Sequence, residues 1–398
     1  MTSEYTLNEL RLNKLIVEVS IMGLIKVEGE LIHDAAVFVA HGGYQIIFNT
    51  RDKGLAWVQV GDNIYSDDDN GNINSEKTVH KIFVEKDELD SAKEYTIRFA
   101  RCIDRKPYFA ESGETFEKTY SFKPMNKEDN INIYMICDSH SRTVEPAESG
   151  KYFGDDLDAL ILNGDIPNHS GSIEHLLSIY YITSKITEGR VPVIYARGNH
   201  DTRGRMAIGF ADYVATDNGN LFYTFRIGSI WGVVLDCGED KNDDHPEYGG
   251  MANFDTYRAA QTRFLKNIIK NKENEYAASD VKYKIAICHV RMDLYKDEYF
   301  TRHYKEWLKA LNEIGINVML NGHEHRRNYL PAGRDTEIGK IGYHTVLGGS
   351  FERRDLPDGS KIRNMHGTAL TFNNNKIDVV FTDGTYQKLE EHIIDIDK

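Results

Sequence analysis

The stretch INIYMICDSH, residues 131–140, places an apolar run typical of a buried strand directly before an aspartate and a histidine. Later apolar runs also lead into residue types that bind metal ions. They are LDALILN (157–163) before Asp165, VPVIYA (191–196) before Asn199 and His200, VKYKIAIC (281–288) before His289, and INVMLN (316–321) before His323 and His325. Because loops beyond the carboxyl ends of strands in an α/β sheet converge on one crevice, the pattern predicts a single site.

Stretches of helical period separate these runs, so this part of the chain is predicted to be α/β. The expected helices cover residues 171–186, 254–270 and 300–314. Further strands are expected at 221–227, 230–236, 343–349, 367–374 and 376–384.

The sequence before residue 125 has a different pattern. Between Ala36 and Phe122, short runs rich in Val, Ile, Phe, Tyr and Trp alternate with turn-forming Gly, Asp and Asn. This spacing is typical of an all-β sandwich. After the polar segment KPMNKEDN (123–130) the α/β pattern begins. We therefore predict an N-terminal β-sandwich domain over 1–125 and a catalytic domain over 126–398.

The composition limits the class of partner. The chain has 398 residues, and 48 Lys and Arg against 62 Asp and Glu give a formal charge of −14. An acidic balance argues against nucleic acid or an anionic membrane as the main partner. No run approaches the roughly 18 apolar residues of a membrane span, and the start MTSEYTLNELRLNK lacks the order of a signal peptide. We expect a cytoplasmic protein without a membrane partner.

The residue types that end the five runs indicate a dinuclear metal site. Aspartate, asparagine and histidine without cysteine suit Mn, Fe, Zn or similar divalent ions. There are too many ligands for one ion, whereas two ions about 3.5–4 Å apart that share a carboxylate would activate water for in-line attack at phosphorus. Gly164, Gly198 and Gly322 precede ligand candidates, and we expect them to allow close approach of the backbone.

The order Asp-x-His, Gly-Asp, Gly-Asn-His-Asp, His, Gly-His-x-His resembles the five-motif signature of the calcineurin-like metallophosphoesterases, over about residues 131–350. The resemblance implies a four-layer α/β/β/α sandwich. It implies that the first metal is held by Asp138, His140, Asp165 and His325, and the second by Asp165, Asn199, His289 and His323. By the same resemblance His200 faces the leaving-group oxygen as a general acid or stabilises the transition state, and Asp201 orients its ring. Asp201 can instead cap a helix.

A sandwich followed by this catalytic domain is similar to the architecture of purple acid phosphatases. The segment KEYTIRF (93–99) resembles the Tyr-bearing penultimate strand of a fibronectin-III-like module, so an FnIII/Ig-like fold is expected. That subfamily would carry a tyrosine ligand three residues after Asp165, where this chain has Asn168. We therefore expect two divalent ions, Mn first with Fe, Zn or Mg as alternatives, and no purple ferric centre.

Candidates for substrate binding flank the motifs. Arg197, Arg203 and Arg291 can grip a phosphate bidentately, although solvated surface arginines are commoner. His245 lies in the Gly-rich segment DDHPEYGG (243–250), which either lines the substrate pocket or is an ordinary connection.

These observations predict a hydrolase of phosphoric esters that uses a metal-bridging hydroxide as nucleophile. A phosphomonoesterase acting on a small-molecule or protein phosphoester is the first expectation. A phosphodiesterase of cyclic nucleotide or glycerophosphodiester type is the alternative. A catalytically silent binding scaffold is a third hypothesis, and the oligomeric state is not indicated by the sequence.

Overall fold

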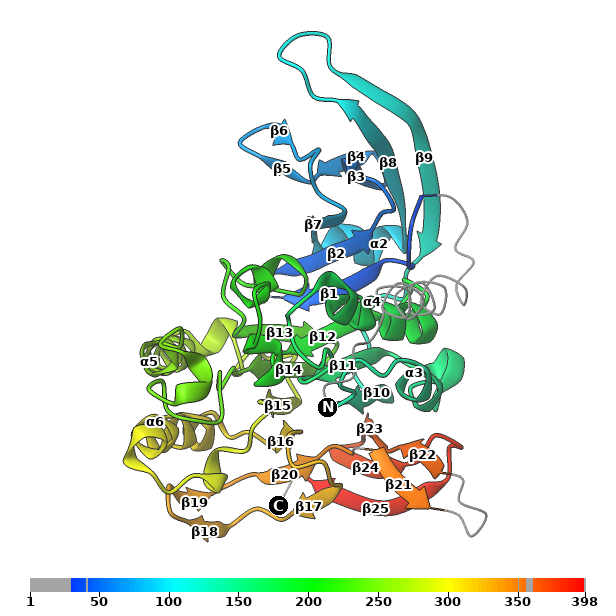
Figure 1. The fold of residues 1–398 in the computed structure, drawn as a ribbon. Coiled ribbons are helices and arrows are strands. Elements are labelled where there is room, and N and C mark those ends of the chain that lie inside the picture. The colour runs from blue at the N-terminus through cyan, green and yellow to red at the C-terminus, as the bar shows by residue number, and fades with distance from the viewer. Residues whose placement is uncertain (1–29, 41, 350, 356–360, 397–398) are drawn as a thin grey trace.

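The computed structural model describes residues 30–40, 42–349, 351–355 and 361–396, which form two large sheets and a smaller one (Figure 1). The nine-stranded sheet has the order β25 (Lys388–Asp395), β24 (Lys376–Thr382), β23 (Gly367–Asn373), β10 (Ile131–Ile136), β11 (Ala159–Asn163), β12 (Pro192–Ala196), β1 (Ala36–Ala40), β2 (Gly43–Asn49), β7 (Val79–Glu85). The six-stranded sheet has the order β13 (Tyr223–Ile227), β14 (Ile230–Val234), β15 (Tyr283–Ile287), β16 (Val318–Asn321), β20 (His344–Leu347), β17 (Asn328–Leu330).

Parallel strands form the centre of both large sheets. β10, β11 and β12 are parallel neighbours, as are β14, β15, β16 and β20. All residues of β11 and β12 are buried, which explains their continuous apolar runs. One hydrophobic cluster contains residues of both sheets, among them Ile133 of β10 and Ile285 of β15. The parallel strands therefore bring their carboxyl ends to one edge of the molecule, here called the carboxyl edge.

Helices pack on the outer faces of these sheets. α5 (Phe254–Lys270) and α6 (Glu298–Ile314) cover the six-stranded sheet through a cluster that joins Trp231 and Val233 to Leu265 and Trp307. α3 (Val144–Ser149) and α4 (Ile173–Thr187) lie beside the nine-stranded sheet on the opposite side (Figure 1). The three helices expected from the sequence are confirmed, with α4 and α6 displaced by two residues at most.

Connections and smaller elements complete the described chain. The remaining sheet has the order β4 (Asn63–Ser66), β3 (Gly54–Val60), β8 (Glu94–Asp104), β9 (Glu111–Ser121). Two-stranded pairs are β5 (Asp68–Asp69) with β6 (Asn72–Ile73), β18 (Arg334–Thr336) with β19 (Gly339–Ile341), and β21 (Phe351–Asp355) with β22 (Lys361–Met365). α2 (Lys86–Ala92) connects β7 to β8. In the described ranges, no helix combines the length and the apolar character needed to cross a membrane.

The N-terminal strands divide between two sheets. β1 pairs in parallel with β12 through Val37 and Pro192, so β1, β2 and β7 extend the nine-stranded sheet. β3, β4, β8 and β9 form the separate sheet that projects from the molecule (Figure 1). The strand-rich N-terminal region and the α/β fold are confirmed. The boundary expected near residue 125 does not separate the sheets, because strands from both sides of it pair directly.

Side-chain contacts also join the two regions. The hydroxyl of Tyr95 in β8 donates to the carbonyl of Gly189 after α4, at 2.8 Å. Asp34 accepts hydrogen bonds from Lys118 and Tyr120 of β9 and from Ser184 of α4. The FnIII/Ig-like identity of the N-terminal strands and the four-layer order of the catalytic domain stay predictions.

Candidate metal centre

The loops that follow β10, β11, β12, β15 and β16 meet at the carboxyl edge, as the five motifs predict. Within the described part of the chain, three groups of side chains have potential ligand atoms within 4.8 Å of one another. The groups are Asp138, His140 and His325; His140, Asp165 and His200; and Asp165, His289 and His323. The first and third groups correspond to the two half-sites expected from the sequence, and the second joins them.

An unusual backbone conformation marks these loops. Five of the seven expected ligands have a left-handed conformation, with φ between 48° and 68°: Asp138, His140, Asp165, His323 and His325. Residues other than glycine rarely adopt this region, and such strain is found preferentially at functional sites. The loops are thus held in conformations that aim the side chains at a common centre.

The more deeply buried half-site surrounds His289. Its Nδ1 lies 2.6 Å from the carbonyl oxygen of Asn163, so Nδ1 carries a proton and Nε2 is turned toward the carboxylates. Nε2 lies 3.2 Å from Asp165 Oδ2 and 3.7 Å from Asp138 Oδ1. The side-chain oxygen of Asn199 lies 3.0 Å from Nδ1 of His323, which completes this half-site.

The second half-site is more open to solvent. Nε2 of His140 and Nε2 of His325 face each other at 3.1 Å, and the latter lies 3.3 Å from Asp138 Oδ1. The carboxylate of Asp138 also accepts the backbone N–H of His323, at 3.0 Å. The side chain of His325 is 52% exposed, so solvent or a substrate can reach this half-site.

Two glycines show how closely the loops pack. A Cβ on Gly164 would lie 2.5 Å from the ring of His289, and Gly164 also has φ of +75°. A Cβ on Gly198 would overlap Oδ1 of Asp165. The expectation of close backbone approach is confirmed at these positions, because any larger residue would displace a ligand candidate.

Electrostatics couple the buried groups. Burial disfavours the charged forms of His289 and Asp165, but their mutual attraction outweighs burial. The pKa of His289 is raised to about 10, with Asp138 contributing, and the pKa of Asp165 is held well below its ordinary value. Burial and the neighbouring His289 lower the pKa of His323. In the absence of a cation, a proton on His289 therefore balances the buried carboxylates.

The residues fit a metal centre. Nε2 of His289 is fully buried and has no hydrogen-bond partner of good geometry among the described residues, although it points at two carboxylates. Nε2 atoms of His140 and His325 likewise converge beside the carboxylate of Asp138. Imidazole nitrogen and carboxylate oxygen arranged in this manner suit borderline divalent ions. Asp138, His140, Asp165, Asn199, His289, His323 and His325 are therefore the residues that can hold metal ions.

His200 lies beside this set. Its backbone N–H donates to Asp165 Oδ1 at 2.9 Å, and its ring packs edge-on against the ring of His140 with centroids 4.6 Å apart. Its Nδ1 lies 2.8 Å from the carbonyl oxygen of Asn168. A carbonyl only accepts, so Nδ1 carries the proton, and Nε2 is left to act in the site.

The expected partnership between Asp201 and His200 is wrong. Oδ2 of Asp201 accepts from the Tyr195 hydroxyl at 2.9 Å and from the Gly198 N–H at 2.8 Å. Its side chain is fully buried, and burial together with the charge of Asp165 raises its pKa well above the ordinary value. Asp201 holds the loop that bears Asn199, while the Asn168 carbonyl takes the place expected for it at the His200 ring.

The arginines expected to bind phosphate are already paired with carboxylates. Arg197 Nε lies 2.7 Å from Asp236 in a buried pair. Arg203 forms a bidentate pair with Glu239, at 2.9 and 2.8 Å. The structure thus gives both side chains a carboxylate partner that fixes loops, and their contact with a phosphate stays a prediction.

Arg291 and His245 are also engaged within the protein. Arg291 lies 2.9 Å from Asp293 and 3.3 Å from Glu324. Nδ1 of His245 accepts the N–H of Glu247 at 3.3 Å, which caps a short 3-10 turn. Their contact with substrate stays a prediction, and each side chain has a partner within the protein.

The sequence did not point to the backbone oxygens that orient the histidines. The carbonyls of Asn163 and Asn168 fix the rings of His289 and His200, and a carbonyl has no residue-specific signature. Asp236 and Glu239, which neutralise arginines, follow β14 as the ligand candidates follow other strands. Their place after an apolar strand, which they share with the ligand candidates, is the feature of the sequence that could have identified Asp236 and Glu239.

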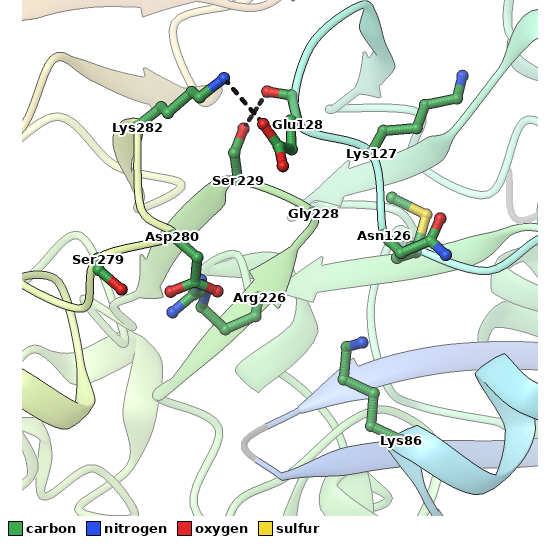
Figure 2. Close-up of a pocket in the computed structure, with 11 residues that line it drawn as sticks. Lys86, Asn126, Lys127, Glu128, Arg226, Gly228, Ser229, Ser279, Asp280 and Lys282 are labelled. Atoms are coloured by element: carbon green, nitrogen blue, oxygen red, sulfur yellow. Dashed lines mark hydrogen bonds and ion pairs between the residues drawn. The ribbon is translucent and has the colours of Figure 1, made fainter.

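A separate cavity lies away from this centre. It has a volume of about 650 Å³ and is lined by residues that precede β10, β14 and β15, at what we call the amino edge (Figure 2). Its cations are paired: Arg226 with Asp280, Lys282 with Asp129, and Lys127 with Asp158. None of the expected site residues lines it.

Comparison with known proteins agrees with this architecture. A purple acid phosphatase from seeds of yellow lupin (Lupinus luteus) is 11% identical, with a TM-score of 0.57 over 91% of this chain and 74% of that chain. PhoD is 11% identical, with a TM-score of 0.51 over 87% of this chain and 85% of that chain. No curated protein matches the chain in sequence. Residues 131–327 match the family of calcineurin-like phosphoesterases, so the chain carries a calcineurin-like phosphoesterase domain over these residues.

Proposed function

We propose that this protein hydrolyses phosphoric esters with two divalent metal ions bound at the carboxyl edge. The observation that supports this proposal is the convergence of imidazoles and carboxylates from five loops, with Nε2 of His289 buried and turned toward the carboxylates of Asp165 and Asp138. Asp138, His140, Asp165 and His325 would hold one ion, and Asp165, Asn199, His289 and His323 the other. Asp165 would then bridge the two ions.

When bound, two such ions activate a water molecule and neutralise charge on the phosphoryl oxygens. The chain's own residues do the rest. Asp165 accepts the backbone N–H of His200 and so links the bridge to the loop of the proposed acid. Because Nδ1 of His200 keeps its proton on the Asn168 carbonyl, Nε2 would face the leaving oxygen and would donate a proton to it from the doubly protonated ring, which is left neutral.

A phosphomonoester is the first substrate class that we propose. Two divalent ions and the carboxylates of Asp138 and Asp165 leave a net charge of about +2 before the hydroxide is counted, and this positive charge attracts a monoester dianion near neutral pH. Small phosphorylated molecules and phosphoproteins both offer this group. We propose Mn as the resident ion, with Fe, Zn or Mg as alternatives, and a cytoplasmic location.

A phosphodiester is the second candidate. Arg197, Arg203 and Arg291 are paired with carboxylates and add no net charge for a dianion. A diester carries one negative charge fewer and would need less compensation. A silent scaffold is less well supported, since every ligand position is filled and five of the seven ligand candidates are held in a strained conformation.

The test is steady-state hydrolysis of p-nitrophenyl phosphate against bis-p-nitrophenyl phosphate by metal-free protein reloaded with Mn. Asp165→Asn is the inactive control, and Asp280→Asn, in an ion pair at the amino edge, is its matched control. Preference for the monoester supports a phosphatase, and preference for the diester supports a phosphodiesterase. No turnover of either ester with two ions bound would refute the proposed function and favour the scaffold.

A further inference from the structure

A chain of hydrogen bonds leads from α4 to the ring of His200. Nδ1 of His175, in the first turn of α4, lies 2.7 Å from the hydroxyl of Ser141. The same hydroxyl accepts the backbone N–H of Asn168 at 2.8 Å. The carbonyl of Asn168 in turn lies 2.8 Å from Nδ1 of His200. The Asn168 residue is therefore held at its N–H by Ser141 and uses its carbonyl to hold His200.

The directions of these bonds follow from chemistry. The Asn168 N–H can only donate, so Ser141 Oγ accepts there and has its own proton free for His175. Burial and the neighbouring His169 lower the pKa of His175, which favours the neutral ring that accepts at Nδ1. The rings of His169 and His175 are in contact, with centroids 4.0 Å apart.

The position of Ser141 is itself constrained. Its φ is 62°, and its backbone N–H donates to the carbonyl of Ile166 at 2.7 Å. It follows His140 directly, so one short loop supplies a ligand candidate and an anchor for the Asn168 segment. Ser170 fastens the other end of the Asn168 segment, because its hydroxyl donates to the carbonyl of Asp201 at 2.7 Å.

We propose that Ser141 and His175 are positioning residues that fix the Asn168 carbonyl and thereby the tautomer and direction of the His200 ring. This inference rests on the proposed function for its kinetic consequence. The hydrogen-bond chain itself can be tested without turnover. A loosened Asn168 segment would let the His200 ring rotate or change tautomer, and Nε2 would lose its aim at the leaving oxygen.

The kinetic test uses the phenyl and p-nitrophenyl esters of whichever ester class the enzyme hydrolyses. Phenolate is a poor leaving group that needs a proton, whereas p-nitrophenolate leaves without one. General acid catalysis contributes about 10²–10⁴-fold, so partial misplacement in Ser141→Ala should lower kcat for the phenyl ester by about 10-fold and that for the p-nitrophenyl ester by less than about threefold. His175→Ala should behave alike, and His175→Asn, which keeps a polar atom near the place of Nδ1, should restore activity. Ser178→Ala removes another hydroxyl of α4 that bonds to the His175 carbonyl and is the matched control.

A double-mutant cycle separates positioning from general loosening. In a His200→Ala background, Ser141→Ala should have no further effect on the phenyl ester, because the group it positions is gone. Equal losses on both esters, or full additivity with His200→Ala, would overturn the proposal.

A spectroscopic readout keeps the inference testable if neither ester is hydrolysed. In Zn-loaded protein with ¹⁵N-labelled histidine, His200 should show a protonated Nδ1 in wild type and a mixture of tautomers in Ser141→Ala. An unchanged His200 signal in the variant would overturn the positioning role. Absent turnover with the expected ¹⁵N change would refute only the proposed function.

Discussion

The two edges of the parallel sheets differ in how their polar groups are satisfied. At the amino edge, a cavity of about 650 Å³ is rich in Lys and Arg (Figure 2). However, Arg226, Lys282 and Lys127 each pair with a carboxylate. At the carboxyl edge, left-handed loops hold imidazoles whose nitrogens converge on one another and on the carboxylates of Asp138 and Asp165. The difference teaches that charge and cavity volume alone do not mark a site. Strained backbone at residues whose potential ligand atoms converge does so.

The largest expected effect comes from the residue that joins the two half-sites. Asp165→Asn should lower turnover by several orders of magnitude and reduce the content of both ions while the fold survives. His325→Ala, on the exposed half-site, should lose one ion and retain the other. Metal analysis of the purified variants, with turnover at saturating Mn, checks this comparison. Near-wild-type turnover of metal-replete Asp165→Asn would contradict the bridging role.

A smaller effect is expected from crowding the carboxyl edge without removing a ligand. Gly198→Ala places a Cβ on Oδ1 of Asp165, and a displacement of about 1 Å in such a site can cost about 10²-fold in rate. Gly113→Ala on β9 is the matched control, because its Cβ would lie 3.7 Å from the nearest atoms. Unchanged kcat in Gly198→Ala would show that the loop accommodates the added Cβ without disturbing Asp165.

The affinity for metal should increase as the pH rises. The pKa of His289 is raised to about 10 without metal, so the ring is protonated at pH 7–9 and must lose that proton to bind an ion. Affinity should therefore rise about tenfold per pH unit in this range for each proton displaced. Competition of Mn with a chelator at pH 7 and pH 9 measures the slope. Equal affinities at the two values would contradict protonation of His289 in the metal-free protein.

The smallest effect belongs to the amino edge. Arg226 is 26% exposed and pairs with Asp280, which is 71% exposed, so Arg226→Ala should change the free energy of unfolding by about 0–1 kcal/mol. Turnover should be unchanged. Urea denaturation and the p-nitrophenyl phosphate assay test both statements. A large loss of activity would mean that the amino edge takes part in function and would remove the contrast between the edges.

Much of the carboxyl edge could be predicted from the sequence because strand and motif are adjacent in the chain. The run INIYMIC is followed directly by the ligand candidates Asp138 and His140, so one continuous stretch of sequence predicts both the strand and the ligands at its end. Ion pairs between residues distant in sequence could not be predicted in this way, since Arg197 contacts Asp236 only in the folded protein. Motif residues were found for this reason, while the partners that neutralise the arginines were not.

The N-terminal region illustrates a second limit. β1 and β2 are buried at every position, whereas β3 alternates between buried and half-buried residues. Continuous burial is typical of strands inside a larger sheet, and alternation is typical of a sandwich. The run AVFVA thus carried a signal that β1 joins the catalytic sheet, although its register with β12 depends on contacts distant in sequence.

The nine-stranded sheet, which contains strands from both the N-terminal region and the catalytic domain, also affects how the chain folds during synthesis. Asp34 and Ser184 are 150 positions apart in sequence and form a hydrogen bond, and β1 pairs with β12 in the same region. During synthesis the N-terminal strands leave the ribosome long before these partners exist, and non-local pairing of this kind folds slowly. We expect the nascent chain to hold an open apolar strand edge during this interval, so its yield in cells should depend on chaperones that cover such edges.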